Sequence, residues 1–88
     1  MIYKVSFSKV ALKAIKKMDQ SNSKILLGWI KKNLEGTDNP YKQGKQLKGN
    51  LSKFWRYRVG DYRILCEIKD GELIIIVVAI GHRREIYK

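Results

Sequence analysis

Two turn dipeptides in the C-terminal half constrain the fold of this chain more than any other feature. Gly60-Asp61 and Asp70-Gly71 each separate segments with the patterning of β-strands. Two-residue turns of these compositions join neighbouring antiparallel strands, through a type II′ turn at the first and a type I′ turn at the second. We therefore predict strands over 54–59, 62–69 and 73–80.

The N-terminal half predicts one strand followed by two helices. Residues 2–7 alternate between apolar and polar, which is typical of a strand. Ser8 is suited to cap a helix over 9–18, whose apolar residues recur at helical spacing. A second amphipathic helix is expected from about Ser23 to Leu34. Within it, Gly28 is expected to serve close packing.

These elements predict an α+β fold of order β-α-α-β-β-β. Residues 37–46 contain Asn39-Pro40 and Gly44, so we expect them to form a loop. Residues 73–80 are apolar on both faces, which indicates a central strand. We expect one domain, residues 1–88, with a two-helix hairpin packed on one face of a mainly antiparallel four-stranded sheet.

The first turn also predicts which side chains face each other. Residues whose numbers sum to 121 lie opposite each other around Gly60-Asp61, so Arg58 faces Arg63. Trp55, Tyr57 and Val59 then point to the opposite, helix-packed side. A like-charged cross-strand pair destabilises a sheet. Either an anion binds between the two arginines or solvent screens them.

The second turn predicts the rest of the helix-free face. A two-residue connection at Asp70-Gly71 would place Arg63, Leu65 and Glu67 on the face shared by Val78, Ile76 and Ile74. That face is basic near the first turn and apolar toward the middle. A half-apolar open face suggests that a partner or substrate covers it.

Composition narrows the choice of partners and of chemistry. The 88 residues include 19 Lys and Arg against 8 Asp and Glu, a net charge of +11. Nucleic acid is the first partner that this charge suggests, an acidic protein the second and an anionic membrane surface the third. The longest apolar run is far shorter than a membrane span, so we expect a soluble, cytoplasmic protein.

The sequence lacks the sets of residues that form most known kinds of catalytic and metal site. The chain has a single histidine, His82, and a single cysteine, Cys66, which alternates with apolar residues and is expected in the core. We therefore expect no metal site, no cofactor and no internal disulfide. The C-terminal segment 81–88 gathers two arginines, a histidine and a tyrosine, a set that suits phosphate and base contacts or simply a solvated basic tail.

Three stretches of the chain carry a family resemblance. They are "ALKAIKKM" at 11–18, "QLKGNLSKFWRYRVGDYRILCEI" at 46–68 and "VVAIGHRREIYK" at 77–88. Through them the sequence resembles the RelE toxins within the RelE/ParE superfamily of toxin–antitoxin systems. The resemblance implies a ribosome-dependent endoribonuclease that cleaves mRNA in the A site. In that chemistry the 2′-OH attacks the scissile phosphate without a metal ion. It also implies a cognate acidic, RelB-like antitoxin, and we expect the free toxin to be a monomer.

The resemblance implies roles for particular residues. Arg63 matches the arginine that holds the phosphate, Arg83 the arginine that stabilises the phosphorane, and Tyr87 the aromatic that stacks on a base. Arg56 and Arg58 stand where the best-known member has lysines, and arginine is a poor general base. His82 is then the first candidate for the base, followed by Glu85 and Tyr87. Further RNA contacts are expected from Lys48, Lys53, Arg84 and Lys88.

Two other functions fit the same resemblance and charge. One is a ParE-like inhibitor that binds gyrase on the same fold. The other is a basic RNA-binding module without catalysis. The terminal Arg83 and Tyr87 argue against the gyrase inhibitor, whereas the RNA-binding module would bind RNA in a salt-dependent manner without cleaving it.

Overall fold

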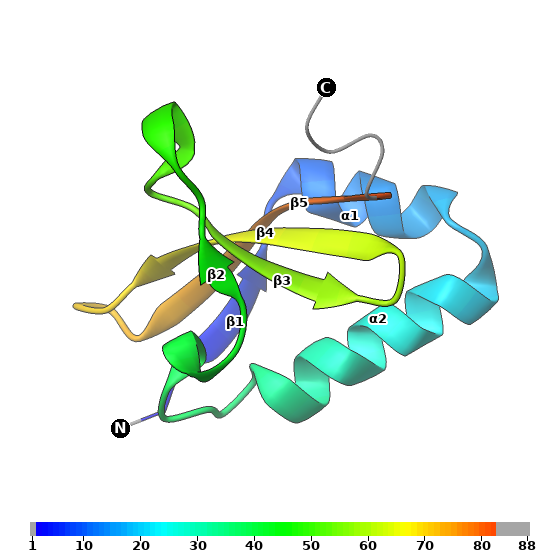
Figure 1. Ribbon diagram of the computed structural model, residues 1–88. Helices are drawn as coiled ribbons and strands as arrows, with labels where there is room; N and C mark the ends of the chain where they lie inside the picture. The colour runs from blue at the N-terminus through cyan, green and yellow to red at the C-terminus, as the bar shows by residue number, and fades with distance from the viewer. Residues whose placement is uncertain (1, 83–88) are drawn as a thin grey trace.

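The computed structural model describes residues 2–82, in which two helices pack on one face of a mixed five-stranded sheet (Figure 1). The elements are β1 (Lys4–Phe7), α1 (Lys9–Lys17), α2 (Gln20–Asn33), η1 (Pro40–Lys42), β2 (Lys45–Gln46), η2 (Gly49–Leu51), β3 (Trp55–Val59), β4 (Tyr62–Lys69) and β5 (Ile74–His82). The strand order is β1-β5-β4-β3-β2, with β1 parallel to β5 and all other neighbours antiparallel. The predicted α+β class is confirmed, with β2 as an additional short strand.

Both helices begin at side-chain caps. The Ser8 hydroxyl accepts a hydrogen bond from the Ala11 amide at 3.0 Å, which confirms the predicted cap of α1. α2 begins at Gln20, earlier than expected, because the Asp19 carboxylate accepts from the Asn22 amide at 2.9 Å. The gap of residues 19–22 expected between the two helices is therefore reduced to a short junction.

The β3–β4 hairpin has the predicted register. Arg58 pairs with Arg63, and Tyr57 pairs with Ile64. Gly60 has a φ of +60° while Asp61 keeps a negative φ, as a type II′ turn requires. The hairpin therefore directs Arg58 and Arg63 to one face of the sheet and the core residues to the other.

The β4–β5 connection differs from the prediction. The loop contains four residues, 70–73, and the residue with positive φ is Leu73, at 55°, rather than Gly71. Glu67 pairs with Ile76, and a bulge between Leu65 and Cys66 shifts the register again, so that Leu65 pairs with Ala79. The expected placement of Val78 beside the arginines is wrong, because the longer loop and the bulge move Ala79 and Gly81 into those positions.

The segment before β3 is more ordered than the predicted loop. Tyr57 Oη donates to the Pro40 carbonyl at 2.6 Å, and Trp55 Nε1 donates to the Gln43 carbonyl at 2.7 Å. Gly44 then takes a φ of +82°, and a Cβ added there would collide with the Arg56 carbonyl oxygen. These contacts hold β2 against the first half of β3.

The core lies between the sheet and the helices. Its buried members come from the residue before β1, both helices, the C-cap of α2 and the three central strands. They are Tyr3, Ala11, Leu26, Ile30, Leu34, Tyr57, Val59, Ile64, Cys66, Ile75, Val77 and Ile80. Gly28 does not take part: apart from its chain neighbours and the adjoining helix backbone, no described atom lies within 4 Å of a Cβ built on it, so the expected close packing is wrong. Within residues 2–82, no helix is long and apolar enough to cross a membrane.

Candidate functional site

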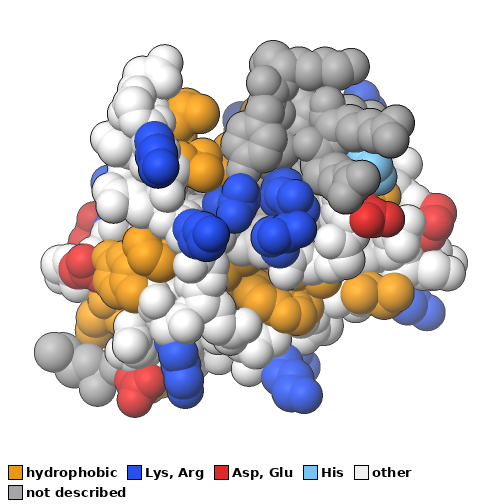
Figure 2. Space-filling model, in the orientation of Figure 1, with side chains coloured by type: hydrophobic (Ala, Val, Ile, Leu, Met, Phe, Trp, Pro, Cys, Tyr) orange, Lys and Arg blue, Asp and Glu red, His pale blue; other side chains and the backbone are white. Residues whose placement is uncertain are grey.

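Four basic residues occupy neighbouring positions on the face of the sheet that the helices leave free. Lys45 of β2 pairs with Arg56 of β3, and Arg58, two residues along β3, pairs with Arg63 of β4. Side chains two residues apart on a strand share a face, as do directly paired residues. Lys and Arg side chains gather at the centre of the face seen in Figure 2. We call Lys45, Arg56, Arg58 and Arg63 the basic row.

Arg63 is the most constrained member of the basic row. Its exposed fraction is only 9%, and its Nε and Nη1 atoms have no hydrogen-bond partner among residues 2–82. Buried polar groups of folded proteins are normally paired, so such a group needs an explanation. Arg58 lies directly opposite and adds a second positive charge. A bound anion would satisfy the guanidinium and neutralise both charges.

The register separates His82 from the basic row. His82 pairs with Tyr62, and the two rings meet edge to face with centroids 5.8 Å apart. Tyr62 pairs with the core residue Val59 and contacts Asn22 of α2 through its hydroxyl. His82 therefore lies on the helix side of the sheet, whereas the arginines lie on the other side.

The two predicted RNA-binding lysines of the β2–β3 connection lie at the far end of β3 from the Gly60 turn. Lys48 precedes η2, and the Lys53 ammonium lies 5.1 Å from the centroid of the Phe54 ring. Figure 1 shows this connection projecting from the body of the fold beside β2. These lysines extend the positive surface beyond the basic row rather than joining it.

Five of the sequence-predicted residues lie outside the described range 2–82. They are Arg83, Arg84, Glu85, Tyr87 and Lys88. Their roles remain predictions from the resemblance.

The described residues offer little other chemistry near this face. Burial raises the pKa of the Cys66 thiol to about 12, so this cysteine stays protonated in the core, as the sequence predicted. Within residues 2–82, no group of three or more His, Cys, Asp or Glu side chains could hold a metal ion. The part of the site that the structure describes therefore consists of fixed positive charge.

The sequence alone does not single out Lys45. It falls within the expected loop 37–46, whereas β2 carries it into register with Arg56. Gly44 is the one sequence signal for this strand pairing. Glycine alone tolerates both the positive φ of this position and its close approach to β3.

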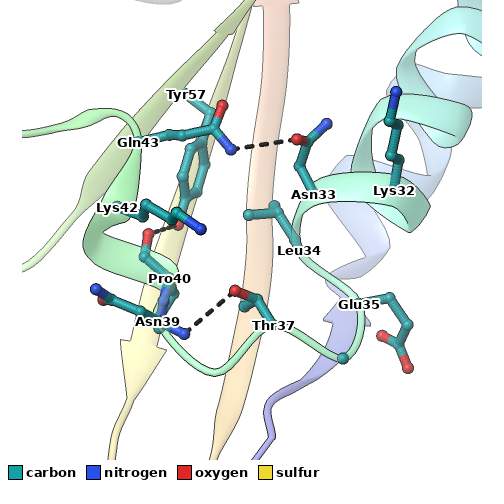
Figure 3. A pocket seen from close by; sticks show the side chains of 11 residues that line it. Lys32, Asn33, Leu34, Glu35, Thr37, Asn39, Pro40, Lys42, Gln43 and Tyr57 are labelled. Atoms are coloured by element: carbon teal, nitrogen blue, oxygen red, sulfur yellow. Dashed lines mark hydrogen bonds between the residues drawn. The ribbon is translucent and has the colours of Figure 1, made fainter.

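A large hollow lies on another part of the molecule, between the end of α2 and η1 (Figure 3). It measures about 340 Å³ and is lined by residues of 32–43 together with Tyr57. Gln43 Nε2 donates to Asn33 Oδ1 at 3.2 Å across it. This hollow shares no residue with the basic row.

A protein-family model matches almost the whole chain. Residues 5–87 match the family described as the ParE toxin of the type II toxin–antitoxin system parDE. A curated RelE-like toxin protein of Escherichia coli is 33% identical over 84 residues, which cover 94% of this chain and 85% of that protein.

Solved structures show the same fold in toxins and toxin–antitoxin complexes. The RelBE2 complex of Mycobacterium tuberculosis contains a chain that matches with a TM-score of 0.85 and 24% identity, over 97% of both chains. The isolated Escherichia coli RelE toxin matches with a TM-score of 0.73 and 21% identity, over 97% of this chain and 90% of that one. A chain of the RelB–RelE complex of Methanococcus jannaschii gives 0.63 and 29% identity, over 93% and 94%.

Proposed function

The chain belongs to the RelE/ParE family of toxins of type II toxin–antitoxin systems, and from this premise we propose that it is a metal-independent, ribosome-dependent mRNA endoribonuclease. The observation that carries the proposal is the buried Arg63 guanidinium, whose Nε and Nη1 atoms lack hydrogen-bond partners among the described residues and which lies opposite Arg58 on the helix-free face of the sheet. A phosphate is the ligand that this geometry accepts most readily, because guanidinium groups match phosphate oxygens in shape and charge.

The proposed reaction is an internal transfer at phosphorus. The 2′-oxygen of the nucleotide bonds to the scissile phosphorus while the bond from phosphorus to the 5′-oxygen breaks. The 2′-OH releases its proton and the 5′-oxygen gains one, which gives a 2′,3′-cyclic phosphate and a free 5′-OH. Arg63 and the remaining basic row stabilise the extra negative charge of the phosphorane.

We assign the role of general base to none of the described residues. Arginines stay protonated, and His82 lies on the helix side of the sheet. We propose that charge stabilisation by the arginines supplies most of the rate, and that the ribosome positions the mRNA for in-line attack. Glu85 and Tyr87 remain candidates for proton transfer.

The proposed partners follow from the family and the charge. An acidic antitoxin would bind the toxin with its net charge of +11, and several similar structures are complexes of RelE with RelB. The second partner is the ribosome with mRNA in its A site. We propose that the free toxin is a monomer acting in the cytoplasm.

The decisive experiment is primer extension on an mRNA translated in a purified bacterial system. We expect new stops within codons for the wild-type protein and none for Arg63→Met or Arg83→Ala. Lys16→Ala, which removes one positive charge from the exposed face of α1, is the matched control and should cleave normally. Full cleavage by Arg63→Met would refute the site.

A gyrase inhibitor is the second candidate, because the matching family model is that of ParE toxins. It predicts that stoichiometric toxin blocks gyrase supercoiling while translated mRNA stays intact. A basic RNA-binding module would give neither result and would bind RNA in a salt-dependent manner.

A further inference from the structure

The proposed reaction needs a proton at the 5′-oxygen. This oxygen leaves phosphorus as an unfavourable alkoxide unless a positioned acid gives it a proton in the transition state, and such a transfer contributes about 10²–10⁴ in rate. Guanidinium groups are unsuited to this role, because they stay protonated in proteins. Three of the four residues of the basic row, Arg56, Arg58 and Arg63, are therefore excluded as the proton donor.

Lys45 is the fourth member of the basic row. A lysine ammonium carries three N–H donors and, unlike a guanidinium, can release a proton as a general acid. Lys45 is paired with Arg56, so Arg58 is its diagonal neighbour at about 7–8 Å, a separation that long side chains span. Lys45, Arg56 and Arg58 also line one hollow of about 220 Å³. A phosphate held between Arg58 and Arg63 therefore lies within reach of the ammonium.

The chain on both sides of Lys45 is bonded to β3, which fixes the backbone from which this side chain extends. Before it, the Gln43 carbonyl accepts a hydrogen bond from Trp55 Nε1 at 2.7 Å. After it, the Leu47 amide donates to the Phe54 carbonyl at 3.1 Å. The Lys45 side chain itself is exposed, so water can return a proton to its amine after each reaction.

Other proton-bearing side chains of residues 2–82 are less suitably placed. Lys69 shares the helix-free face but lies six residues along β4 from Arg63, about 20 Å away, and its ammonium is 3.7 Å from the Glu67 carboxylate. The Tyr57 hydroxyl and His82 lie on the helix side of the sheet. The lysines of the two helices are on that side as well (Figure 1). Lys45 alone combines a transferable proton with a position in the basic row.

We infer that Lys45 is the general acid of this reaction, whose Nζ gives a proton to the 5′-oxygen as the bond from phosphorus to that oxygen breaks. The proton of the 2′-OH passes to water, and the neutral Lys45 amine takes one back from water, so the protein is unchanged at the end. The scissile phosphate then lies over Arg58 and Arg63 with its 5′-oxygen toward β2. The inference rests on the proposed function, because it takes that cleavage as the reaction.

The test measures single-turnover cleavage on ribosomes programmed with an mRNA whose scissile position has been mapped by primer extension. Two substrates are compared, the ordinary mRNA and one in which sulfur replaces the 5′-bridging oxygen at that position. A thiolate leaves without a proton, because thiols are far more acidic than alcohols. The variant is Lys45→Arg, which keeps the positive charge and removes the transferable proton.

Lys45→Arg should cleave the oxygen substrate at least about 10²-fold more slowly than the wild type. It should cleave the sulfur substrate at the wild-type rate. Lys42→Arg is the matched control, because Lys42 is an exposed lysine of η1 outside the basic row. It should cleave both substrates normally. The melting temperatures of both variants should equal that of the wild type, since both substitutions are at the surface.

Normal cleavage of the oxygen substrate by Lys45→Arg, or an equal loss on both substrates, overturns the inference while the proposed ribonuclease stands. Equal loss would show that Lys45 contacts the RNA without giving it a proton. A wild-type protein that cleaves the oxygen substrate but not the sulfur one also overturns the inference, because a leaving group that needs no proton should depart more easily. A wild-type protein that cleaves neither substrate overturns the proposed function and the inference together.

Discussion

Replacing Arg63 by methionine should separate what this residue does for the reaction from what it does for the fold. Methionine is unbranched, flexible and apolar, so it suits a buried position beside Leu65. The guanidinium charge disappears. Because Arg63 is 9% exposed and two of its nitrogens lack partners among residues 2–82, we expect the folded protein to gain stability while it loses activity.

The magnitudes follow from the contacts. A like-charged pair directly opposite on neighbouring strands costs up to about 1 kcal/mol, and Arg63→Met removes the Arg58–Arg63 pair. Buried donors without partners cost at least about 1 kcal/mol more. For a domain of this size each kcal/mol corresponds to roughly 4–8 °C, so the melting temperature should rise by at least about 4 °C. Loss of one charge-stabilising group should lower the cleavage rate by about 10²–10³.

The assay pairs thermal unfolding of the free toxin with mRNA cleavage in a purified translation system. Ile64→Met provides a control on the neighbouring core position of β4, where the same residue type should lower the melting temperature because it disturbs a fully buried isoleucine. A drop in melting temperature for Arg63→Met with cleavage retained would show that Arg63 is a structural residue and would refute the reasoning.

Three further predictions concern the contacts around η1 and β2. Gly44→Ala should lower the free energy of unfolding by more than about 1 kcal/mol in urea titrations, because its Cβ would meet a β3 carbonyl and its φ is +82°; a neutral effect would contradict the close approach. Tyr57→Phe should cost roughly 1 kcal/mol by the same measurement, since the buried bond to Pro40 is lost, and unchanged stability would show that water replaces it. Hydrogen bonds from Tyr3 and Tyr41 lower the pKa of Asp70. The ionised Asp70 carboxylate therefore stabilises the folded protein fully above the ordinary carboxyl pKa, and this stabilisation is lost as pH falls through the lowered pKa. Burial and the Asp70 hydrogen bond raise the pKa of Tyr41 to about 12, so its stabilisation is complete below pH about 10 and lost as pH rises toward 12. The melting temperature measured across pH should therefore fall at both the acid and the alkaline end. Asp70→Asn should reduce the fall at the acid end, and an unchanged fall in that variant would contradict the role given to Asp70.

The parts of the fold that depend on local rules were predictable. Ser8 caps α1, and the Gly60 turn fixes the β3–β4 register by its length and its glycine. Turn chemistry alone is therefore enough to place Arg58 opposite Arg63. Alternation along β3 likewise puts Tyr57 in the core.

The parts that depend on tertiary contacts were not predictable in the same way. Asp-Gly favours a two-residue turn, yet the Asp70 carboxylate accepts hydrogen bonds from Tyr3 and Tyr41, which are distant in the sequence. A four-residue loop forms instead and shifts β5. β2 was not predicted for a related reason. Two residues are too few to show a strand pattern, and β2 is held in place by contacts between the preceding segment and β3.

The arrangement of β3 explains how so small a protein maintains a cluster of like charges. Every second residue of this strand joins the core with α2, and this burial favours folding whether or not the other face is neutralised. The alternate residues Arg56 and Arg58 are thereby held side by side with Arg63 at a cost that a bound anion would offset. Under the proposed function, the core side of β3 therefore supports the fold while the arginine side supports the reaction. Arg63→Met should accordingly reduce cleavage by the free toxin without destabilising the fold.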